Sequence, residues 1–407
     1  MTFSEIVELH GHIIDSYALP RIMDEVMDRG GEFEIRDIRV GRHKDEPSYA
    51  RIQISAPTRE LLELLIDQAL RIGAVPEDIE QVNLVPAPAD GVFPEGFYST
   101  TNLETAVRLA GQWVRVEWPE MDCAIAVDPP RSRAWTVALS DVKRGEQIVI
   151  GHDGVRVTPL ERPRAQPQVF AFMGSSVSSE KPKALLIHEI AERMRQIRAR
   201  QGRVILVSGP VLVHTGTRDN VASLIREGYV NVLFAGNGLA THDIEMAMFG
   251  TSLGVSLSEG IPQEGGHEHH LRAINRVRRA GSIRAAVEQG LLTNGIMHAC
   301  VCANATYILA GSIRDDGPLP DVVTDTLRAQ RLMREEVRKG ADLVLVLSSM
   351  LHGIATGNLL AASVTTVCVD INPAVVTKLS DRGSFQAIGL VMDVEGFLRE
   401  LCADLGI

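Results

Sequence analysis

The stretch that decides the fold is VNVLFAGNGLATHDIE, residues 230–245. Its apolar run stops at Gly236-Asn237-Gly238 and gives way to a helix-like sequence. A buried strand that ends in glycines and feeds a helix is one way to build a phosphate or dinucleotide site, and it is also a common way to turn a chain. The rest of the sequence has to decide between these two interpretations.

Similar apolar runs recur through the second half of the chain, where they alternate with helical stretches. The runs are RVILVSGP, VNVLFAGN, GIMHACVCAN, YILAGSI, ADLVLVLSSM, TTVCVDIN and AIGLVMDV. Uninterrupted apolar runs indicate strands that are buried on both faces. Strands that alternate with helices indicate a doubly wound parallel sheet. The sequence therefore predicts an α/β nucleotide-binding domain over residues 181–407.

The first ninety residues predict a separate module. Strand-like stretches are IVELHGHII, EFEIRDIRVG, YARIQISA and DIEQVNLVPA, and helix-like stretches are ALPRIMDEVMDRGG and TRELLELLIDQALRIGA. Thr58 is placed to cap the second helix. The resulting order, β-α-β-β-α-β, is that of a ferredoxin-like module over residues 1–90.

Residues 91–180 predict a small β-rich domain and a linker. The strand-like stretches there are short: WVRVEW, CAIAVD, AWTVAL, EQIVIG and VRVTP. Short strands separated by turn residues are typical of a small sandwich or barrel. The segments PLERPRAQPQ and MGSSVSSEKP are rich in Pro or Ser, which favours a linker before the third domain.

Composition excludes several classes of protein. The chain has 407 residues, 45% of them hydrophobic, and a net charge of -11, which is unlike a general nucleic-acid binder. No apolar run approaches the ~18–20 residues of a membrane-spanning helix. The start, MTFSEIVELHG, lacks the features of a signal peptide. Five cysteines are a sparse, odd count, and we expect a cytoplasmic protein with neither a membrane nor a nucleic-acid partner.

Polar residues follow the predicted strands of the third domain. In a doubly wound sheet, ligands bind outside the carboxyl ends of the strands. Backbone N–H groups and small hydroxyls there suit a pyrophosphate, and an acid that closes a strand suits ribose hydroxyls. We therefore expect a dinucleotide to bind at these strand ends, on Asn237, Gly238, Asp316, Ser348, Ser349, Met350, Leu351, Asp370 and Asp393.

The spacing of these residues supports a dinucleotide only in part. Asp370 lies 19 residues beyond Leu351, near the ~20 residues expected between a dinucleotide turn and its ribose acid. A full G-x-G-x-x-G is absent, so the cradle would be a variant one. Alternatively, Gly-Asn-Gly is an ordinary turn, and Asp370 and Ser348-Ser349 cap the helices that follow.

Two further segments carry groups able to move protons or hold an amine. EGGHEHHLRAINRV contains His267 and Glu268, which could shuttle protons near neutral pH or simply begin a solvated helix. Their spacing matches no usual zinc motif, and we expect no metal. SIRDDGPLPD contains Asp315 and Asp316, which suit an amine or a ribose, although a structural loop is the alternative. HACVCAN, with Cys300 and Cys302, favours buried cysteines on a strand.

Long motifs of this chain resemble one enzyme family. FAGNGLATHDIE, GGHEHHLRAINRVRRAGSI, LAGSIRDDGPLPDV and VDINPAVVTKLSDRGSFQ together resemble the archaeal-type ornithine cyclodeaminase family. That family carries a domain of the lysine-oxoglutarate reductase/saccharopine dehydrogenase type. Similar sequence forms the carboxyl-terminal part of cyanobacterial arginine dihydrolase/ornithine cyclodeaminase proteins. The resemblance implies a nucleotide-binding domain similar to the deoxyhypusine synthase fold.

The resemblance also implies an activity, the conversion of L-ornithine to L-proline and ammonia with NAD that is recycled. Such a reaction needs an acid to hold one amine and a base to deprotonate the other. The candidates are Glu268, His267, Asp315 and Asn304. An NAD-dependent amino-acid dehydrogenase and a non-catalytic NAD-sensing regulator are the alternatives. We expect a small basic amino acid as the ligand and a homo-oligomer as the assembly.

Overall fold

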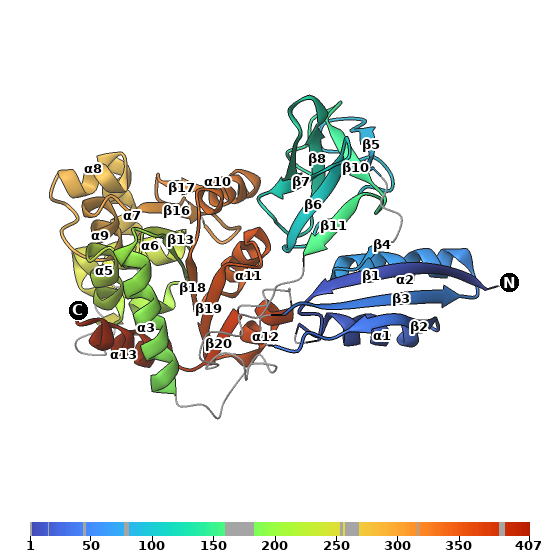
Figure 1. Ribbon diagram of the computed structural model, residues 1–407. Helices are drawn as coiled ribbons and strands as arrows, with labels where there is room; N and C mark the ends of the chain where they lie inside the picture. Colours follow the sequence, from blue (N-terminus) through green and yellow to red (C-terminus); the bar gives the residue numbers. More distant parts are fainter. Residues whose placement is uncertain are drawn as a thin grey trace. The chain divides into compact units, whose positions relative to one another are not determined.

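The computed structural model describes residues 2–14, 16–43, 46–76, 81–158, 183–252, 255–256, 268–315, 317–381 and 387–407. The chain forms two compact units (Figure 1). Unit 1 comprises residues 1–174 with 360–363, and unit 2 comprises residues 175–359 with 364–407. The domain limits predicted at residues 90 and 180 stay predictions, and the Pro- and Ser-rich linker at 159–182 lies outside the described residues.

The amino-terminal sheet of unit 1 has the predicted β-α-β-β-α-β order. Its elements are β1 (Phe3–Gly11), α1 (Ala18–Asp28), β2 (Glu32–Arg39), β3 (Ser48–Ala56), α2 (Arg59–Ile72) and β4 (Val75–Pro76). The strands lie in the order β2-β3-β1-β4. Every second residue of β3 is buried, as expected for a sheet covered on one face. Thr58 caps α2 as predicted, since its side chain accepts a hydrogen bond from the Leu61 amide.

The strand expected at residues 78–87 belongs to a different sheet. The four-stranded sheet is closed by β4, which pairs with β1 directly after α2 ends at the left-handed Gly73. The later strand, β5 (Asn83–Pro86), pairs with β10 of the β-rich part. The prediction of a strand was right, but its assignment to the first sheet was wrong, because two residues after the Gly73 turn suffice to fill the edge beside β1.

A seven-stranded sheet forms the β-rich part of unit 1. Besides β5 its members are β6 (Glu104–Leu109), β7 (Gln112–Glu117), β8 (Ala124–Asp128), β9 (Arg133–Val137), β10 (Gln147–Ile150) and β11 (Val155–Thr158), with the 3-10 turn η1 (Pro129–Arg131) between β8 and β9. The strand order is β11-β6-β7-β9-β8-β10-β5. All five predicted strands are present, whereas β6 was not predicted.

Segments that lie far apart in the sequence contact one another within unit 1. His152 of the β-rich part lies 2.7 Å from the carboxylate of Asp67 on α2. Farther along the chain, the amide of Ala362 donates to the carbonyl of Asn102 at 2.8 Å. Ala362 also packs with Leu103 and Val157 in a small buried cluster. A short segment from the second half of the sequence therefore completes the first unit.

The sheet of unit 2 is parallel throughout and has seven strands. They are β12 (Val204–Ser208), β13 (Val232–Gly236), β16 (Thr306–Ala310), β17 (Val322–Val323), β18 (Leu343–Leu347), β19 (Thr365–Asp370) and β20 (Ala387–Val391). Their order is β17-β16-β13-β12-β18-β19-β20, and each neighbouring pair is parallel. Every residue of β12, β18 and β19 is buried. The predicted doubly wound sheet is confirmed.

Helices cover both faces of this sheet (Figure 1). Figure 1 shows α3 and α13 on one side of β18 and β19, and α11 and α12 on the other. The helices are α3 (Lys183–Ala199), α4 (Val211–His214), α5 (Arg218–Arg226), α6 (Asn237–Phe249), α7 (His269–Ala280), α8 (Ile283–Glu288), α9 (Ile296–Cys302), α10 (Thr326–Arg338), α11 (Met350–Leu359), α12 (Pro373–Asp381) and α13 (Val394–Leu405). A two-stranded ribbon, β14 (Thr251–Ser252) with β15 (Val255–Ser256), follows α6.

The predicted strand at GIMHACVCAN was wrong, because this stretch forms α9. The carboxylate of Asp243 on α6 accepts hydrogen bonds from the amides of Ile296 and Met297, at 2.9 and 2.8 Å. Asp243 is fully buried and also accepts from Arg218 at 2.6 Å. A carboxylate from another helix thus caps α9, because it satisfies amides that the first turn of a helix leaves without partners.

Candidate functional site

The order of the strands in unit 2 reverses between β12 and β18. From β12 the chain moves outward through β13 to β16, whereas β18 begins a second series on the other side of β12. At such a reversal the connections leave the two strands toward opposite faces, and a crevice opens at their carboxyl ends. At this position β12 ends with Ser208 and continues into Gly209-Pro210, whereas Ser348-Ser349 follow β18.

The two loops at the reversal touch through their backbones. A Cβ atom added to Gly209 would lie 2.6 Å from the carbonyl oxygen of Ser348, so only glycine allows this approach. Residues 208–210 were not predicted as site residues. The Ser-Gly-Pro that closes the first strand was a usable signal for them.

The turn after β18 carries a variant of the dinucleotide fingerprint. Ser348 adopts a left-handed conformation with φ of 47°, as the first glycine of G-x-G-x-x-G does when it makes the tight turn. Five residues later Gly353 of α11 packs on β18, where an added Cβ would lie 2.6 Å from Cγ1 of Val346. Only glycine therefore fits at this close approach of α11 to β18. Met350 takes the position of the middle glycine, so the fingerprint is incomplete, and the variant cradle stays a prediction.

The first turn of α11, which follows Ser348-Ser349, has two exposed residues. Met350 and Leu351 are 45% and 75% exposed, although both are large apolar residues. The first amides of a helix have no partners within it and carry a partial positive charge, which suits an anion such as a pyrophosphate. The cradle therefore offers N–H donors beside two exposed apolar side chains.

Asp370 closes β19, the next strand along the sheet. Its Oδ1 accepts from the amide of Asn372 at 2.8 Å, which fixes the carboxylate at the strand end. No second partner for this carboxylate is found within the described part of the chain. Asp370 is thus both a local cap and an available acceptor, at the position where dinucleotide-binding folds place a ribose ligand.

A network of side chains joins the ends of β13 and β16. Asn237 is buried at the start of α6 and donates to Oδ1 of Asp315 at 3.1 Å. Its own oxygen accepts from Thr241 and from the Leu319 amide. Oδ2 of Asp315 accepts from the Ser312 amide at 2.7 Å. Asn237 and Asp315 were both predicted as site residues, and the structure brings them together. Their hydrogen bonds hold the loop after β16 in place.

The remaining predicted cofactor residues are placed differently. Gly238 follows Asn237 in α6, near Pro210. Asp316 lies outside the described residues. Asp393 follows the edge strand β20 and caps α13, because its side chain accepts from the amides of Glu395 and Gly396. The structure therefore gives Asp393 a structural task.

Among the predicted catalytic residues, Asn304 lies at the opposite end of the sheet from the expected site. Asn304 is exposed between α9 and β16, next to the amino-terminal edge of the sheet, so the structure does not bring it to the strand carboxyl ends. Glu268 precedes α7 and pairs with Arg272 at 2.6 Å. His267 lies outside the described residues.

A histidine cluster surrounds a buried carboxylate beside α7. Glu245 of α6 is fully buried and lies 2.9 Å from Nδ1 of His242. Thr251 links the same carboxylate to His269, at 3.0 and 2.8 Å. The ring of His214 stacks edge-on against His242, with centroids 4.9 Å apart. Burial and the neighbouring His242 lower the pKa of His214, although Glu245 opposes the change.

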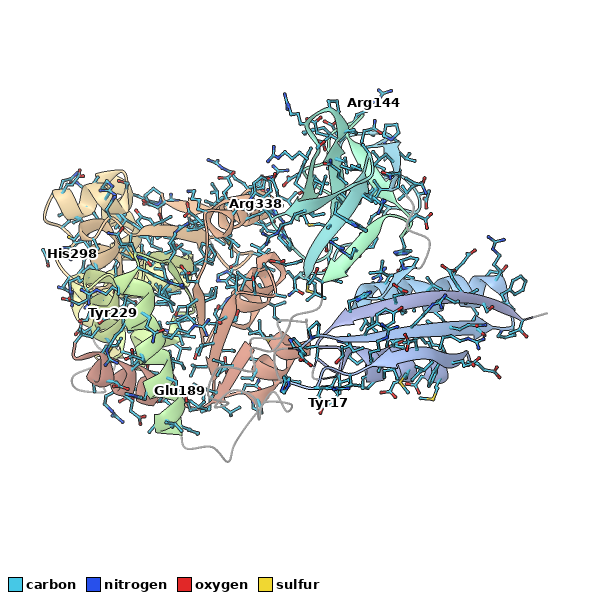
Figure 2. All side chains as sticks on the ribbon, in the orientation of Figure 1. Tyr17, Arg144, Glu189, Tyr229, His298 and Arg338 are labelled. Atoms are coloured by element: carbon cyan, nitrogen blue, oxygen red, sulfur yellow. The ribbon has the colours of Figure 1, made fainter. Side chains whose placement is uncertain are left out.

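Neither this cluster nor the cysteines form a metal site in the part of the chain that the structure describes. Cys300 and Cys302 lie on α9 rather than on a strand. Cys300 is buried as predicted, and burial raises the pKa of its thiol. Cys302 is exposed, and its sulfur lies 3.4 Å from Nε2 of His298. Figure 2 labels His298. All five cysteines are described, and none forms a disulfide. Among the described helices, none has the length and apolarity needed to cross a membrane.

Three family models together match nearly the whole chain. Residues 4–103 match the conserved region of the LOR/SDH bifunctional enzyme. Residues 104–187 match the first region of the carboxyl-terminal part of ArgZ-like arginine dihydrolases. Residues 188–401 match the Rossmann-fold domain of that same part, and this match includes the crevice described above.

Individual relatives cover the chain almost completely. The ornithine cyclodeaminase of Methanopyrus kandleri is 53% identical over 98% of this chain and 97% of its own. The apo structure of the cyanobacterial arginine dihydrolase ArgZ is 39% identical, with a TM-score of 0.86, over 100% of this chain and 58% of its own. The ternary complex of AgrE with ornithine and NAD+ is 42% identical, with a TM-score of 0.54 and the same coverage of both chains.

Proposed function

Because the chain belongs to the family of archaeal ornithine cyclodeaminases, we propose that it converts L-ornithine to L-proline and ammonia with NAD as a recycled cofactor. Relatives at 51–53% identity, over almost their full length, carry the name ornithine cyclodeaminase. AgrE, at 42% identity, has been solved with ornithine and NAD+. The structural observation that carries the proposal is the crevice between β12 and β18, with its variant dinucleotide fingerprint.

The residues of the crevice fit NAD. The left-handed Ser348 turns the chain, the amides of Ser349 and Met350 begin α11, and Gly353 lets that helix lie close to β18. We propose that the pyrophosphate binds these amides and that Asp370 accepts the hydroxyls of the adenosine ribose. When bound, NAD would take a hydride from the substrate and give it back to the cyclic product.

The other predicted site residues have different parts in the proposed site. Both oxygens of Asp315 are occupied within the protein, so Asp315 and Asn237 hold the loop after β16 in place. Glu268 pairs with Arg272 and stays a candidate for holding a substrate amine. His267 and Asp316 stay candidates as well, and Asn304 and Asp393 are left out of the proposed site because of their positions.

The decisive experiment measures the stoichiometry of the reaction. The purified full-length chain is incubated with L-ornithine and a trace of NAD, and proline, ammonia and NADH are assayed. We expect proline and ammonia to exceed the added NAD many times over, without net NADH. Equimolar NADH and a 2-oxo acid would instead identify a dehydrogenase. Binding of NAD without turnover of any basic amino acid would identify a sensor.

We also propose a cytoplasmic location and a homo-oligomeric state. The absence of disulfides among the five cysteines supports a reducing compartment. Symmetric assembly is common among soluble enzymes. Light scattering of the purified chain during size-exclusion chromatography would measure the oligomeric state.

A further inference from the structure

One side chain at the crevice has no assigned part in the proposed reaction. His352 lies in the first turn of α11, four residues beyond the left-handed Ser348. It is partly buried. Its sequence context, SSMLHG, gives no hint of a role, because the residues around it were predicted only as a phosphate-binding turn.

The imidazole of His352 reaches across the strand-order reversal. A Cβ atom added to Gly236 would lie 3.2 Å from Cε1 of His352 and 3.5 Å from the carbonyl oxygen of Ala310. Gly236 ends β13 and Ala310 ends β16, whereas His352 follows β18. Because β12 lies between β13 and β18, the ring spans the carboxyl end of β12. The imidazole therefore lies above the carboxyl end of β12, at the crevice.

The ring of His352 lies against Gly236 at the carboxyl end of β13. Throughout the described residues neither ring nitrogen finds a hydrogen-bond partner, and Gly236 carries no charge. Burial lowers the pKa of His352. The imidazole is consequently neutral at neutral pH, with one nitrogen free to accept a proton and one to donate. A half-buried polar ring without a protein partner is suited to a ligand.

We infer that His352 is the group that carries protons between the two nitrogens of the basic amino acid during ring closure. The inference rests on the proposed function and names a catalytic residue for it. Imidazole suits this task because it takes up and returns protons near neutral pH. Asp315 is less suited, because the hydrogen bonds to its two oxygens fix it in the loop after β16 and stabilise its charged form.

The proton steps balance around one imidazole. After Cα has lost a hydride, it forms an iminium group with the α-nitrogen. The neutral imidazole takes a proton from the δ-ammonium, and the freed δ-amine forms a bond to that carbon. The imidazolium then protonates the α-nitrogen, and its bond to carbon breaks to release ammonia. As ammonia leaves, the ring nitrogen gives one proton to the imidazole, which returns it after the ring has been reduced.

The test compares His352→Gln and His352→Asn with a matched control, His188→Gln. Both amides keep hydrogen-bonding capacity at the site and cannot carry a proton. His188 is exposed on α3, where it pairs with Asp404. We expect kcat for proline to fall about 10²-fold or more in both His352 variants, as for loss of a general acid–base group. NAD affinity and the melting temperature should stay as in the wild type.

A single-turnover measurement makes the test specific. With ornithine and saturating NAD, the His352 variants should accumulate enzyme-bound NADH, because oxidation precedes the blocked ring closure. Wild-type kcat should also fall on the acid side of its pH profile, where the imidazole becomes charged, and this limb should be missing in the variants. The His188 variant should behave like the wild type in each measurement.

Three results would overturn the inference. In the first, the His352 variants form proline as fast as the wild type. In the second, NAD affinity is lost in parallel with turnover, which would make the ring part of the cofactor site instead. In the third, no NADH accumulates in either variant although NAD binds. A wild-type chain that forms no proline would instead refute the proposed function, and with it the inference.

Discussion

In the proposed site, Asp370 is the residue expected to separate NAD from NADP. It ends β19, and the Asn372 amide holds one of its oxygens at 2.8 Å. The carboxylate is therefore fixed in direction before any ligand arrives. A fixed carboxylate accepts hydrogen bonds from two ribose hydroxyls, whereas it repels the 2′-phosphate of NADP.

We predict that Asp370→Ala weakens NAD binding about tenfold or more, since a hydrogen bond to a charged group contributes roughly 1.5–3 kcal/mol. Binding of NADP should change much less, so the preference for NAD should shrink. Calorimetric titration of both nucleotides measures the effect. Asp404→Ala, in the last turn of α13, is the control, since this carboxylate pairs with His188 and Arg195 of α3. An unchanged NAD affinity in the Asp370 variant would remove this carboxylate from the site.

Single residues also show where the sequence was informative about the site. Ser348 and Asp370 were predicted because they close apolar runs, and a run that ends in polar residues is visible in the sequence. His352 and Gly209 were missed because their importance depends on neighbours from other strands. Gly209 matters through the carbonyl of Ser348, and His352 through the space that Gly236 leaves.

At the scale of elements, the stability of α13 provides a test of the capping role assigned to Asp393. Its side chain accepts from the amides of Glu395 and Gly396. We predict that Asp393→Ala lowers the free energy of unfolding by about 1 kcal/mol, the usual cost of losing an N-cap. Asp393→Ser should restore most of the loss, because serine also caps. Chemical denaturation measures stability, and a concurrent loss of NAD affinity would contradict a purely structural task.

His214 on α4, which contacts His242 of α6, leads to a prediction about the pH dependence of stability. The folded state lowers the pKa of His214 below the ordinary 6.5. Below pH 6.5 the unfolded chain therefore binds the proton more readily than the folded one. We predict that stability is full above this pH and falls as the pH drops toward the lowered pKa. In His214→Asn the fall should be smaller. Equal slopes of unfolding free energy against pH in both proteins would contradict the prediction.

The element that sequence reasoning assigned incorrectly, α9, shows what periodicity misses. GIMHACVCAN is short and apolar, and a short apolar run fits a buried strand or a buried helix equally well. Asp243, more than fifty residues earlier in the chain, supplies the cap that starts the helix. A cap from so distant a residue leaves no local signature, unlike that of Thr58 on α2.

At the scale of the whole molecule, the sequence predicted the sheets better than the connections between them. The ferredoxin-like order and the parallel sheet were predicted correctly, because buried strands and amphipathic helices have local periods. The membership of β5 was missed because it depends on which edge is nearest in space. The contribution of residues 360–363 to unit 1 was missed for the same reason.

That contribution has a consequence for anyone who shortens the gene. Two separate segments of the polypeptide form unit 1, so dividing the chain at one position cannot give both units complete. A product that stops at residue 174 lacks the Ala362 amide that donates to Asn102, and it leaves Leu103 and Val157 without their apolar neighbour. To be self-sufficient, the amino-terminal piece would need a grafted copy of that tetrapeptide, and the remainder would need a replacement loop.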